Sequence, residues 1–540
     1  MKDLKIGLAQ INSIIGDFEG NFKIIRQYIR EAKQEAVDLL IFPELAVSGY
    51  PPQDLIFREG FIPLNQKYLD EIAALVPEDM LCIIGFVEKM KEKYYNAAAL
   101  IQNGKIRAVR RKTLLPNYDV FDEKRYFAPS VTQEPVSLDF KGENLSLGIE
   151  ICEDLWDEES PVKVTQNLVE KGADIIINIS ASPFEKGKRE VRNQLVFDKV
   201  NQLGVPFVLV NYCGAQDEII FAGNSIACDR NGNIIALGEE FREGFYTGII
   251  SENNTKTLKV CERPVEEALF NALVLGVRDY FRKTGHQKAV LGLSGGIDSA
   301  LVAVIAARAL GPENLTCIAM PSQYTSGIST ADAKTLADNL GVSFHTLPID
   351  TLYQTFKTVL APLFSGMEDG LAEENIQART RGNIIMSIAN KFGALMLNTG
   401  NKTELALGYC TMYGDMAGAL GVIGDLSKTD VYNLSKFINK KAGKGIIPER
   451  IITRPPSAEL KNGQIDPFDY EIVSPLVDEI INNGADRESL LKKGYEAAVV
   501  DDCLRRIRFS EYKRKQAAPA LKVSKKAFGI GRRYPIVNKY

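Results

Sequence analysis

The stretch AVLGLSGGIDSALVAVIAARAL (289–310) determines how the second half of the chain folds. It begins with a short apolar strand, continues through a turn with two adjacent glycines, and ends in an apolar pattern that predicts a helix from Ser299 to Leu310. The alternation continues in NLTCIAMP, in a helical pattern from Ser329 and in VSFHTLPID, and a helical pattern over 265–283 precedes it. Strands that alternate with helices predict a parallel sheet with right-handed crossovers.

The first half of the chain contains a series of short apolar strands. They are KIGLAQI (5–11), DLLIFPE (38–44), LCIIGFV (81–87), NLSLGIEIC (144–152), DIIINIS (174–180) and PFVLVNY (206–212). Continuous Val, Ile and Leu runs are typical of strands covered on both faces, and helical segments at 21–35 and 191–203 lie between them. Asn-Gly pairs predict hairpins at Asn103-Gly104 and within Asp229–Asn233. Together these features predict a mixed sheet layered with helices.

A polar segment separates the two halves. After the expected strand FYTGIIS (245–251), residues 252–264 are polar, contain a proline and lead into a new helical pattern. A chain of 540 residues is long enough for two large α/β domains. We therefore predict one domain over 1–255 and a second over 256–540.

The composition excludes several classes of protein. With 45% hydrophobic and 25% charged residues, it is typical of an ordinary soluble protein. No apolar run approaches the roughly 18 residues of a membrane span, and the N-terminal residues lack a signal-peptide layout, so we expect no membrane partner. A net charge of −4 gives no general reason to expect nucleic acid. Eight scattered cysteines without a CxxC pair indicate reduced thiols and a cytoplasmic protein.

Three residues at strand ends are candidates for catalysis. Only two histidines are present, His286 and His345, so a histidine base or a multi-histidine metal site is nearly excluded. Glu44, Lys112 and Cys152 each end an expected strand, where side chains converge on a site. A cysteine attacks a carbonyl as its thiolate, a carboxylate can accept the proton, and an ammonium can stabilise charge on the substrate oxygen. From spacing alone, three unrelated residues at the edge of a core are equally consistent.

The segments around these residues carry a family resemblance. FPELAVSGYPPQDL, RKTLLPNYDVFDEKRYF and IEICEDLWDEE resemble the signature segments of the nitrilase superfamily, most closely its glutamine amidase branch. The resemblance covers about 1–255 and implies an αββα sandwich. It also implies that Glu44 is the general base, that Lys112 stabilises the tetrahedral intermediate, and that Cys152 is the nucleophile that forms a thioester.

The same resemblance implies a set of residues around the substrate. Glu123 matches a glutamate that positions the lysine, and three further residues match positions that hold glutamine, namely Tyr118, Ser182 and Lys188. Ser180 and Lys186 lie close enough in sequence to compete for the last two roles.

The motif SGGIDS (294–299) follows a strand and opens a helix. Its glycines let the backbone approach an anion closely, and the free N–H groups at a helix start can bind that anion. Ser294 and Ser299 add hydroxyl donors, while Asp298 beside a phosphate requires a bridging cation, for which Mg²⁺ is the best fit. No lysine follows as in GxxxxGK[ST], and the motif is not GxGxxG, so a γ-phosphate kinase and a dehydrogenase are disfavoured.

SGGIDS resembles the loop of the ATP-pyrophosphatases, which transfer AMP from ATP to a substrate oxygen and release pyrophosphate. The resemblance implies a Rossmann-like, doubly wound parallel sheet. It also implies that the ATP-binding residues are Gly292, Leu293, Ser294, Gly295, Gly296, Ile297, Asp298 and Ser299.

Downstream segments narrow the family. The segments at 397–432, 447–460 (IPERIITRPPSAEL) and 510–523 (SEYKRKQAAPALKV) resemble NAD synthetases. By that resemblance, ATP also contacts Thr399, Lys428 and Ser457. The deamidated dinucleotide contacts Asn375, Glu404 and Lys513, and Mg²⁺ binds Asp298 and Glu404. Asp415 is assigned to the neighbourhood of the same site. Without the resemblance, Lys428 and Lys513 are more simply solvated surface lysines.

The stretch from Arg505 to Arg533 has eleven Lys and Arg residues and one acidic residue, Glu511. A basic run can bind RNA, but interleaved apolar residues predict a folded segment, and a site for ATP and a dinucleotide also needs positive charge. We expect small-molecule partners and no nucleic acid.

The whole chain resembles the glutamine-dependent NAD⁺ synthetases. The resemblance implies that glutamine is hydrolysed to ammonia, which amidates deamido-NAD⁺ by way of an adenylate, with ATP and Mg²⁺, in a homo-oligomer. Two alternatives stay open. One is another glutamine-dependent ATP-pyrophosphatase that aminates a nucleotide base or modifies tRNA. The other is a protein that consumes free ammonia and whose first half is an inactive scaffold.

Overall fold

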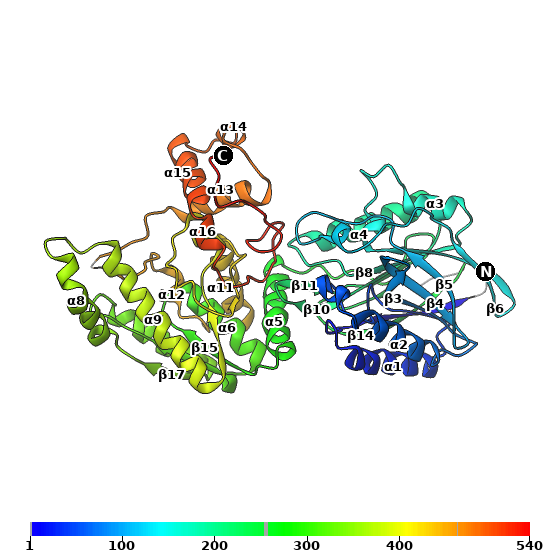
Figure 1. Ribbon diagram of the computed structural model, residues 1–540, viewed down its shortest axis with the longest axis horizontal. Helices are drawn as coiled ribbons and strands as arrows, with labels where there is room; N and C mark the ends of the chain where they lie inside the picture. Colours follow the sequence, from blue (N-terminus) through cyan, green and yellow to red (C-terminus); the bar gives the residue numbers. More distant parts are fainter. Residues whose placement is uncertain (1–2, 253–256, 462) are drawn as a thin grey trace. The chain divides into compact units, whose positions relative to one another are not determined.

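A computed structural model of the protein describes residues 3–252, 257–461 and 463–540 (Figure 1). The chain divides into two compact units, Met1–Glu262 and Arg263–Tyr540. The domain boundary predicted between residues 255 and 256 lies outside the described residues. Each unit is an α/β structure with its own sheets and its own buried core.

The first unit contains two six-stranded sheets, with strand orders β14-β1-β2-β3-β4-β5 and β13-β12-β9-β8-β7-β6. The first sheet consists of β1 (Leu4–Gln10), β2 (Leu39–Ile41), β3 (Leu81–Met90), β4 (Lys93–Gln102), β5 (Lys105–Arg111) and β14 (Gly244–Ile250). The second consists of β6 (Val136–Phe140), β7 (Glu143–Ile151), β8 (Ile175–Ser180), β9 (Phe207–Asn211), β12 (Ile226–Cys228) and β13 (Ile234–Leu237). The central strands of each sheet are parallel and the outer pairs are antiparallel.

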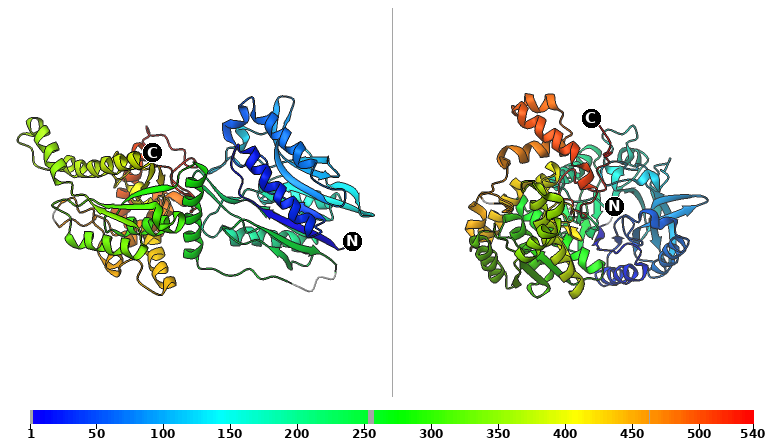
Figure 2. Two further views of the ribbon diagram at one scale, coloured as in Figure 1. Left: turned by 90° about the horizontal axis from the view of Figure 1, so that it is seen from below. Right: turned by 60° about the vertical axis from the view of Figure 1, so that its left-hand side comes forward.

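The two sheets pack face to face and helices cover both outer faces (Figure 2). Residues such as Ile6 and Ile83 of the first sheet share one buried cluster with Ile149 and Ile177 of the second. The outer helices are α1 (Phe18–Gln34) and α2 (Phe61–Ala73) on the first sheet, and α3 (Val164–Glu170) and α4 (Lys188–Leu203) on the second. The predicted αββα sandwich is thereby confirmed. A short hairpin, β10 (Cys213–Gln216) and β11 (Ile219–Ala222), completes the unit.

The two predicted hairpins differ in detail. Asn103 and Gly104 both have positive φ angles, +51° and +68°, as a primed two-residue turn requires. In the loop between β12 and β13, only Gly232 has a positive φ angle, and the turn is held by Asp229, whose carboxylate accepts hydrogen bonds from the N–H groups of Asn231 and Asn233 (both 2.9 Å). The longer loop therefore relies on a side-chain cap and not on an Asn-Gly turn.

The second unit contains a five-stranded parallel sheet with the order β17-β16-β15-β18-β19. Its strands are β15 (Lys288–Gly292), β16 (Leu315–Ala319), β17 (Ser343–Thr346), β18 (Ala394–Asn398) and β19 (Leu420–Gly421). Strand β15 lies between β16 and β18. From β15 the chain continues to β16 and β17 on one side, and it then returns to β18 and β19 on the other side. The strand order therefore reverses at β15, and ligands of open α/β sheets bind at such a switch point. The doubly wound parallel sheet predicted from the sequence is confirmed, and SGGIDS begins at this point.

Helices surround this sheet and form an additional layer near the C-terminus (Figure 1). Those next to the sheet include α5 (Val265–Lys283), α6 (Ile297–Leu310), α7 (Gly327–Leu340), α8 (Asp350–Phe364), α9 (Leu371–Phe392) and α11 (Lys428–Ala442). The others are α10 (Lys402–Leu407), α12 (Glu449–Thr453), α13 (Tyr470–Asn482), α14 (Arg487–Lys492), α15 (Ala497–Phe509) and α16 (Glu511–Arg514). Helices α10, α13, α14 and α15 share a hydrophobic cluster. Among the described helices, none is both long enough and apolar enough to cross a lipid bilayer.

The basic C-terminal stretch is folded, as predicted. Glu511 pairs with Arg514 (2.8 Å) and with Arg532 (2.5 Å). Arg514 also donates hydrogen bonds to the carbonyl oxygens of Leu405 and Ala406 (3.1 and 2.8 Å). These arginines therefore hold the C-terminal residues against α10.

Candidate active sites

Cys152 begins the short 3-10 helix η3 (Cys152–Leu155) directly after β7. Its φ angle of +46° lies in the left-handed region, so the chain turns sharply at the end of the strand. Asp154 holds this turn, because its Oδ2 accepts a hydrogen bond from the N–H of Ile151 (3.0 Å). Its Oδ1 accepts from the N–H groups of Thr113 and Leu114 (3.0 and 2.7 Å). Asp154 thus joins the cysteine turn to the segment that follows β5.

Glu44 follows β2, and its carboxylate is fully buried. Its Oε1 accepts hydrogen bonds from Lys112 Nζ (2.7 Å) and from Asn96 Nδ2 (2.6 Å). Its Oε2 accepts from the N–H of Ala181 (2.8 Å). The backbone after Glu44 lies so close to β3 that a Cβ at Gly85 would be 2.2 Å from the nitrogen of Leu45. Both oxygens of the carboxylate are therefore fixed in direction.

Lys112 lies between two carboxylates. Its Nζ donates hydrogen bonds to Glu44 (2.7 Å) and to Glu123 Oε1 (2.8 Å), and all three side chains are at most 5% exposed. Tyr50 also donates its hydroxyl hydrogen to Glu123 Oε1 (2.9 Å). The structure thus brings the predicted Glu44, Lys112 and Glu123 into one buried ionic cluster.

The charges in this cluster set its protonation state. Burial, and next the negative charge of Glu44, raise the pKa of the Cys152 thiol. Burial opposes the charge of Lys112, but Glu123 and Glu44 outweigh it and raise the pKa of Lys112 well above its ordinary value. Burial raises the pKa of Glu123 to about 7, because one ammonium cannot fully neutralise two buried carboxylates. The resting cysteine is therefore a thiol, and it must lose its proton as it attacks.

Two of the residues predicted to hold glutamine lie around Glu153, the neighbour of Cys152. Tyr118 donates its hydroxyl hydrogen to the Glu153 carboxylate (3.0 Å). Lys188 Nζ lies 5.7 Å from the centre of the Trp156 ring, and its charge acts on Glu153. Tyr118 is more than half exposed, so its hydroxyl is accessible to a ligand.

Ser182 and its competitor Ser180 are both buried. The N–H of Ser182 donates to Asn211 Oδ1 (2.8 Å), whereas the hydroxyl of Ser180 donates to Asn178 Oδ1 (2.6 Å). The Ser180 hydroxyl is thus engaged within the sheet. Lys186, the competitor of Lys188, is exposed in the loop before α4.

The second unit contains a cavity of about 240 Å³ above the switch point of its sheet. Many of the residues predicted for ATP, metal and dinucleotide binding line it, namely Ser294, Gly296, Ile297, Asp298, Ser299, Thr399, Glu404, Lys428 and Ser457. A neighbouring cavity of about 260 Å³ is lined by Gly292 and Leu293 together with apolar side chains such as Ile318, Met320 and Ile385. Ser294, Thr399 and Asp415 line both, so the two cavities adjoin.

The glycine loop explains why α6 begins at Ile297, two residues earlier than its expected start at Ser299. Gly295 has a φ angle of +83°, and a Cβ there would be 2.2 Å from the carbonyl oxygen of Ser329. Arg454 braces the loop by donating to the carbonyl oxygen of Gly295 (2.7 Å) and to Ser329 Oγ (2.8 Å). Asp298 and Ser299 therefore lie in the first turn of α6, where free N–H groups favour an anion.

Lys428 bridges the two predicted metal ligands. Its Nζ lies 2.6 Å from Asp298 Oδ2 and 3.1 Å from Glu404 Oε1. Burial opposes the charge of Lys428, but Asp298 and Glu404 outweigh it and raise its pKa. Burial also raises the pKa of Glu404 to about 7. The two carboxylates are close enough to share one cation, and Mg²⁺ commonly combines one or two carboxylates with phosphate oxygens. The donor set fits that ion, although no group of three or more metal-ligating side chains occurs in the described ranges.

Asn375 and Lys513 flank the segment 408–411, which borders the cavity of about 240 Å³. Lys513 Nζ donates to the carbonyl oxygens of Gly408 and Cys410 (2.8 and 2.7 Å). Asn375 Oδ1 accepts a hydrogen bond from the hydroxyl of Thr411 (2.9 Å). Asp415 accepts from the N–H of Thr411 (2.6 Å), and burial raises its pKa to about 6.

Sequence reasoning missed several residues that shape these sites. Asn96 lies at the start of an apolar strand segment and Tyr50 lies beside two prolines, and neither has a local pattern that indicates a polar contact. Arg454 likewise precedes two prolines. Asn401 caps α10 by accepting from the N–H of Glu404 (3.0 Å), and its Nδ2 donates to Asp298 Oδ1 (2.8 Å). The capping-box pattern Asn-x-x-Glu was the sequence signal for this residue.

Comparisons with known proteins define the class of protein. The family described as carbon-nitrogen hydrolase matches residues 5–259, and the family described as NAD synthase matches residues 269–517. The protein is therefore a ligase in which a carbon-nitrogen hydrolase unit precedes an NAD synthase unit.

Full-length relatives identify the family. A glutamine-dependent NAD⁺ synthetase of Thermotoga maritima is 42% identical, and the match covers 100% of this chain and 99% of the relative. A solved structure of the Acinetobacter baumannii glutamine-dependent NAD⁺ synthetase in complex with adenosine diphosphate is 35% identical, covers 99% of both chains and has a TM-score of 0.80. A Cytophaga hutchinsonii synthetase, at 23% identity and a TM-score of 0.85, shares the fold. The chain belongs to the family of glutamine-dependent NAD⁺ synthetases.

Proposed function

We propose that the first unit releases ammonia from glutamine and that the second uses it to convert deamido-NAD⁺ to NAD⁺. The observation that carries this proposal is that one chain holds both centres: the Glu44–Lys112–Cys152 constellation and a glycine loop at a sheet switch point. Ammonia is the product of the first centre and the nucleophile of the second. In neutral water it is mostly ammonium, which is not nucleophilic, so we infer transfer inside the protein.

In the first reaction, Cys152 Sγ attacks the side-chain carboxamide carbon of glutamine. Glu44 accepts the thiol proton and passes it to the leaving nitrogen, which departs as ammonia. Lys112 stabilises the negative charge on the tetrahedral oxygen. Water then attacks the thioester with Glu44 as its base, and glutamate leaves. A thiol with a raised pKa needs this adjacent base at the moment of attack.

Around the triad, Glu123 positions Lys112 through their hydrogen bond. Tyr118, Ser182 and Lys188 hold the glutamine. The exposed Tyr118 and the cationic Lys188 on the Glu153 side of Cys152 support this assignment, since free glutamine carries a charged ammonium and a charged carboxylate.

In the second reaction, the nicotinate carboxylate of deamido-NAD⁺ attacks the α-phosphorus of ATP and displaces pyrophosphate. Ammonia then attacks the acyl carbon of this adenylate, which releases AMP and gives NAD⁺. The N–H groups of residues 295–299, with Ser294, Lys428 and Ser457, bind the ATP phosphates, and Thr399 also contacts ATP. Asp298 and Glu404 would hold Mg²⁺, which neutralises phosphate charge when it is bound. Asn375, Glu404 and Lys513 contact the dinucleotide.

A product assay tests the function directly. Incubation with glutamine, ATP, Mg²⁺ and deamido-NAD⁺ should give NAD⁺, AMP, pyrophosphate and glutamate, and omission of any one component should stop NAD⁺ formation. XMP and tRNA are offered in place of deamido-NAD⁺. Pyrophosphate release that depends on either of them, and not on deamido-NAD⁺, would overturn the proposal in favour of another amidotransferase.

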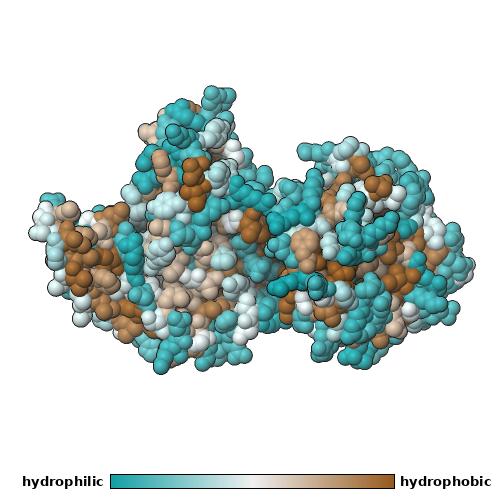
Figure 3. Space-filling view, in the orientation of Figure 1, coloured by the Kyte–Doolittle hydropathy of each residue, from teal (hydrophilic) through white to brown (hydrophobic). Residues whose placement is uncertain are grey.

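We also infer a homo-oligomer, because α8 and α9 expose an apolar face (Figure 3). Val359 and Leu363 are 70% and 76% exposed, and a large apolar groove adjoins them. A second copy of the chain covers this face. Leu363→Asp should lower the mass measured by light scattering, with Lys334→Asp on α7 as an exposed control, and an unchanged mass would refute the interface.

We place the protein in the cytoplasm. The eight cysteines are not joined in disulfides, which is typical of a protein in a reducing compartment. Its partners are small molecules: glutamine, ATP and deamido-NAD⁺.

A further inference from the structure

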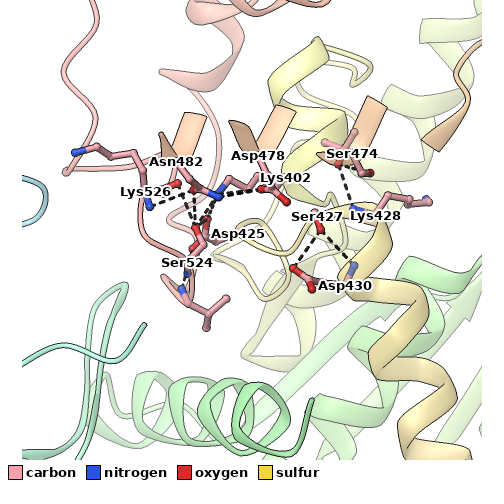
Figure 4. A network of polar contacts seen from close by, with 12 residues as sticks. Lys402, Asp425, Ser427, Lys428, Asp430, Ser474, Asp478, Asn482, Ser524 and Lys526 are labelled. Carbon is pink, nitrogen blue, oxygen red and sulfur yellow. Dashed lines mark hydrogen bonds and ion pairs between the residues drawn. The ribbon is translucent and has the colours of Figure 1, made fainter. Parts of the chain in front are cut away.

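A buried polar cluster lies behind the synthetase cavity, and we call it the Lys402 cluster: Lys402, Asp425, Asn482 and Ser524 (Figure 4). The side chains of Lys402 and Asp425 are fully buried, and Lys402 Nζ lies 3.0 Å from Asp425 Oδ1. The same nitrogen donates to Asn482 Oδ1 (2.8 Å) and to Ser524 Oγ (2.6 Å). A buried ammonium is costly unless it is paired and fully hydrogen-bonded. This one meets that requirement, yet no step of the proposed reaction uses it.

The cluster joins four segments that are distant in sequence. Lys402 begins α10, Asp425 precedes α11, Asn482 ends α13, and Ser524 belongs to the C-terminal segment. Asp425 Oδ2 accepts hydrogen bonds from the N–H groups of Val523 and Ser524 (2.8 and 2.7 Å). The carboxylate therefore holds the C-terminal segment while its other oxygen holds Lys402.

The same C-terminal segment forms part of the cavity wall. The N–H of Gly421 donates to the carbonyl oxygen of Pro519 (2.7 Å), and the N–H of Leu521 donates to the carbonyl oxygen of Gly421 (3.1 Å). The segment thus pairs with β19, the last strand of the sheet. Ala517, Ala518 and Ala520 line the cavity above the glycine loop.

The residues next to Lys402, at the N-cap of α10 and in its first turn, reach the proposed reaction site. Asn401 donates to Asp298 Oδ1 (2.8 Å), and Glu404 Oε1 lies 3.1 Å from Lys428 Nζ. The hydroxyl oxygen of Thr403 accepts a hydrogen bond from the N–H of Lys428 (3.1 Å). A six-residue helix is not stable by itself, so contacts with its surroundings fix its position. Lys402 provides the buried anchor among these contacts.

We propose that Lys402 is a positioning residue for the synthetase site. It fixes α10 against Asp425 and the C-terminal segment, so that Asn401 and Glu404 hold Asp298 and Lys428 in place for ATP and its Mg²⁺. The inference rests on the proposed function of the second unit. An ion pair with only a structural role would stabilise the fold without any specific effect on the metal-dependent part of ATP binding.

The main test uses the double variant K402M/D425N, which removes both fully buried charges together. The further partner of Lys402, Asp478 (3.8 Å), is one-third exposed and stays in contact with solvent. ATP binding to the full chain is measured by titration calorimetry, once with Mg²⁺ and once with EDTA. We expect the dissociation constant with Mg²⁺ to rise about 10- to 100-fold, as for other residues that orient metal ligands, and the constant with EDTA to change much less. K493M is the matched control, because it removes an exposed ion pair with Glu479 on α13.

S524A is the milder variant and keeps both charges. It removes the hydroxyl that links Lys402 to Asp425 (2.8 Å), and we expect binding with Mg²⁺ to weaken about threefold, as for one hydrogen bond. If the double variant does not fold, S524A becomes the test of the proposal. ATP binding by S524A with Mg²⁺ that equals ATP binding by K493M would then overturn the proposal. Equal weakening with Mg²⁺ and with EDTA also overturns it. Wild-type protein that binds ATP with Mg²⁺ but makes no NAD⁺ would refute the proposed function alone.

Discussion

The two candidate active sites organise their charges in opposite ways. In the first unit, Glu44, Lys112 and Glu123 are almost completely buried, and Lys112 is hydrogen-bonded to both carboxylates before any substrate is bound, although Glu123 Oε2 has no hydrogen-bond partner among the described residues. In the second unit, Lys428, Asp298 and Glu404 line an open cavity and pair with one another. The first arrangement fixes groups that act on a small neutral amide. The second keeps one lysine and two carboxylates paired, and these charges must separate when a triphosphate and a cation bind.

The difference teaches that burial serves different purposes at the two sites. A covalent reaction at one carbonyl carbon requires a nucleophile, a base and a cation at fixed positions. A site for ATP must accommodate a large, highly charged ligand, so we expect its residues to exchange partners on binding. Substitutions in the first site should therefore nearly abolish its reaction. Substitutions in the second site should act through the affinity for the ligand and through the loss of charge.

The largest effect is expected for Cys152→Ala. Removal of the nucleophile should lower glutamine-dependent NAD⁺ formation by about 10³-fold or more, because no other thiol occupies this turn. Formation from ammonium salts should be retained, since the second unit is intact. Both rates are measured as NAD⁺ produced. Cys213→Ala is the control, as it removes another buried thiol of the same unit. Persistent use of glutamine by the Cys152 variant would contradict the assignment.

Lys428→Met should reduce NAD⁺ formation about 10²- to 10³-fold with either nitrogen donor. Methionine has a similar length but cannot neutralise phosphate charge, and loss of one such group has effects of this size. The rates are measured with ammonium and with glutamine at saturating Mg²⁺. Lys436→Met, on the exposed face of the same helix, is the control. A defect seen only with glutamine would show that Lys428 acts outside the synthetase reaction.

Much of this organisation could be predicted from the sequence because it depends on local chemistry. Apolar runs defined the strands, and the turns after them placed Glu44, Cys152 and SGGIDS at strand ends. Partners distant in sequence could not be predicted in this way. Lys428 and Asp298 are 130 residues apart, and only the folded sheet brings them together.

Local patterns were also misleading in two places. The pattern of a six-residue helix does not indicate that Lys402 is fully buried, because its partners Asp425 and Ser524 come from other segments. The start of α6 was expected at Ser299, since helical period alone does not show that Gly295 and Gly296 place the chain for an earlier start.

Glu123→Gln tests whether the buried cluster works through charge. The amide retains an oxygen that can accept from Lys112 and Tyr50 but cannot ionise. Because burial raises the pKa of Glu123 to about 7, wild type and variant should hydrolyse glutamine at similar rates below that pH. Above that pH, the ionised wild type should hydrolyse glutamine about tenfold faster than the variant. This ratio corresponds to the free energy of one hydrogen bond to a charged group. Rates of glutamate release are compared from pH 6 to 8.5. A ratio that stays constant with pH would exclude titration of Glu123.

The smallest effect concerns stability and involves Glu150, a buried carboxyl of β7. Its oxygens accept hydrogen bonds from Asn178 (2.9 Å) and Thr165 (2.9 Å), and burial raises its pKa from 4.5 to about 8. A carboxyl with a raised pKa binds its proton more tightly in the folded state than in the unfolded state. Its contribution to stability is therefore present at low pH and decreases as the pH rises from about 4.5 towards 8.

Glu150→Gln should remove this dependence, because an amide can serve both partners without ionising. Between pH 5.5 and 8.5, the free energy of unfolding of the wild type should fall by about 1–3 kcal/mol more than that of the variant. Urea unfolding followed by the fluorescence of Trp156 measures this, since the chain has one tryptophan and it lies in the first unit. Glu158→Gln, an exposed site in the same unit, should keep the wild-type pH dependence. If the free energies of unfolding of the wild type and the Glu150 variant changed equally with pH, Glu150 would be ionised throughout this range. The buried interior of the first unit would then tolerate a carboxylate that no lysine neutralises.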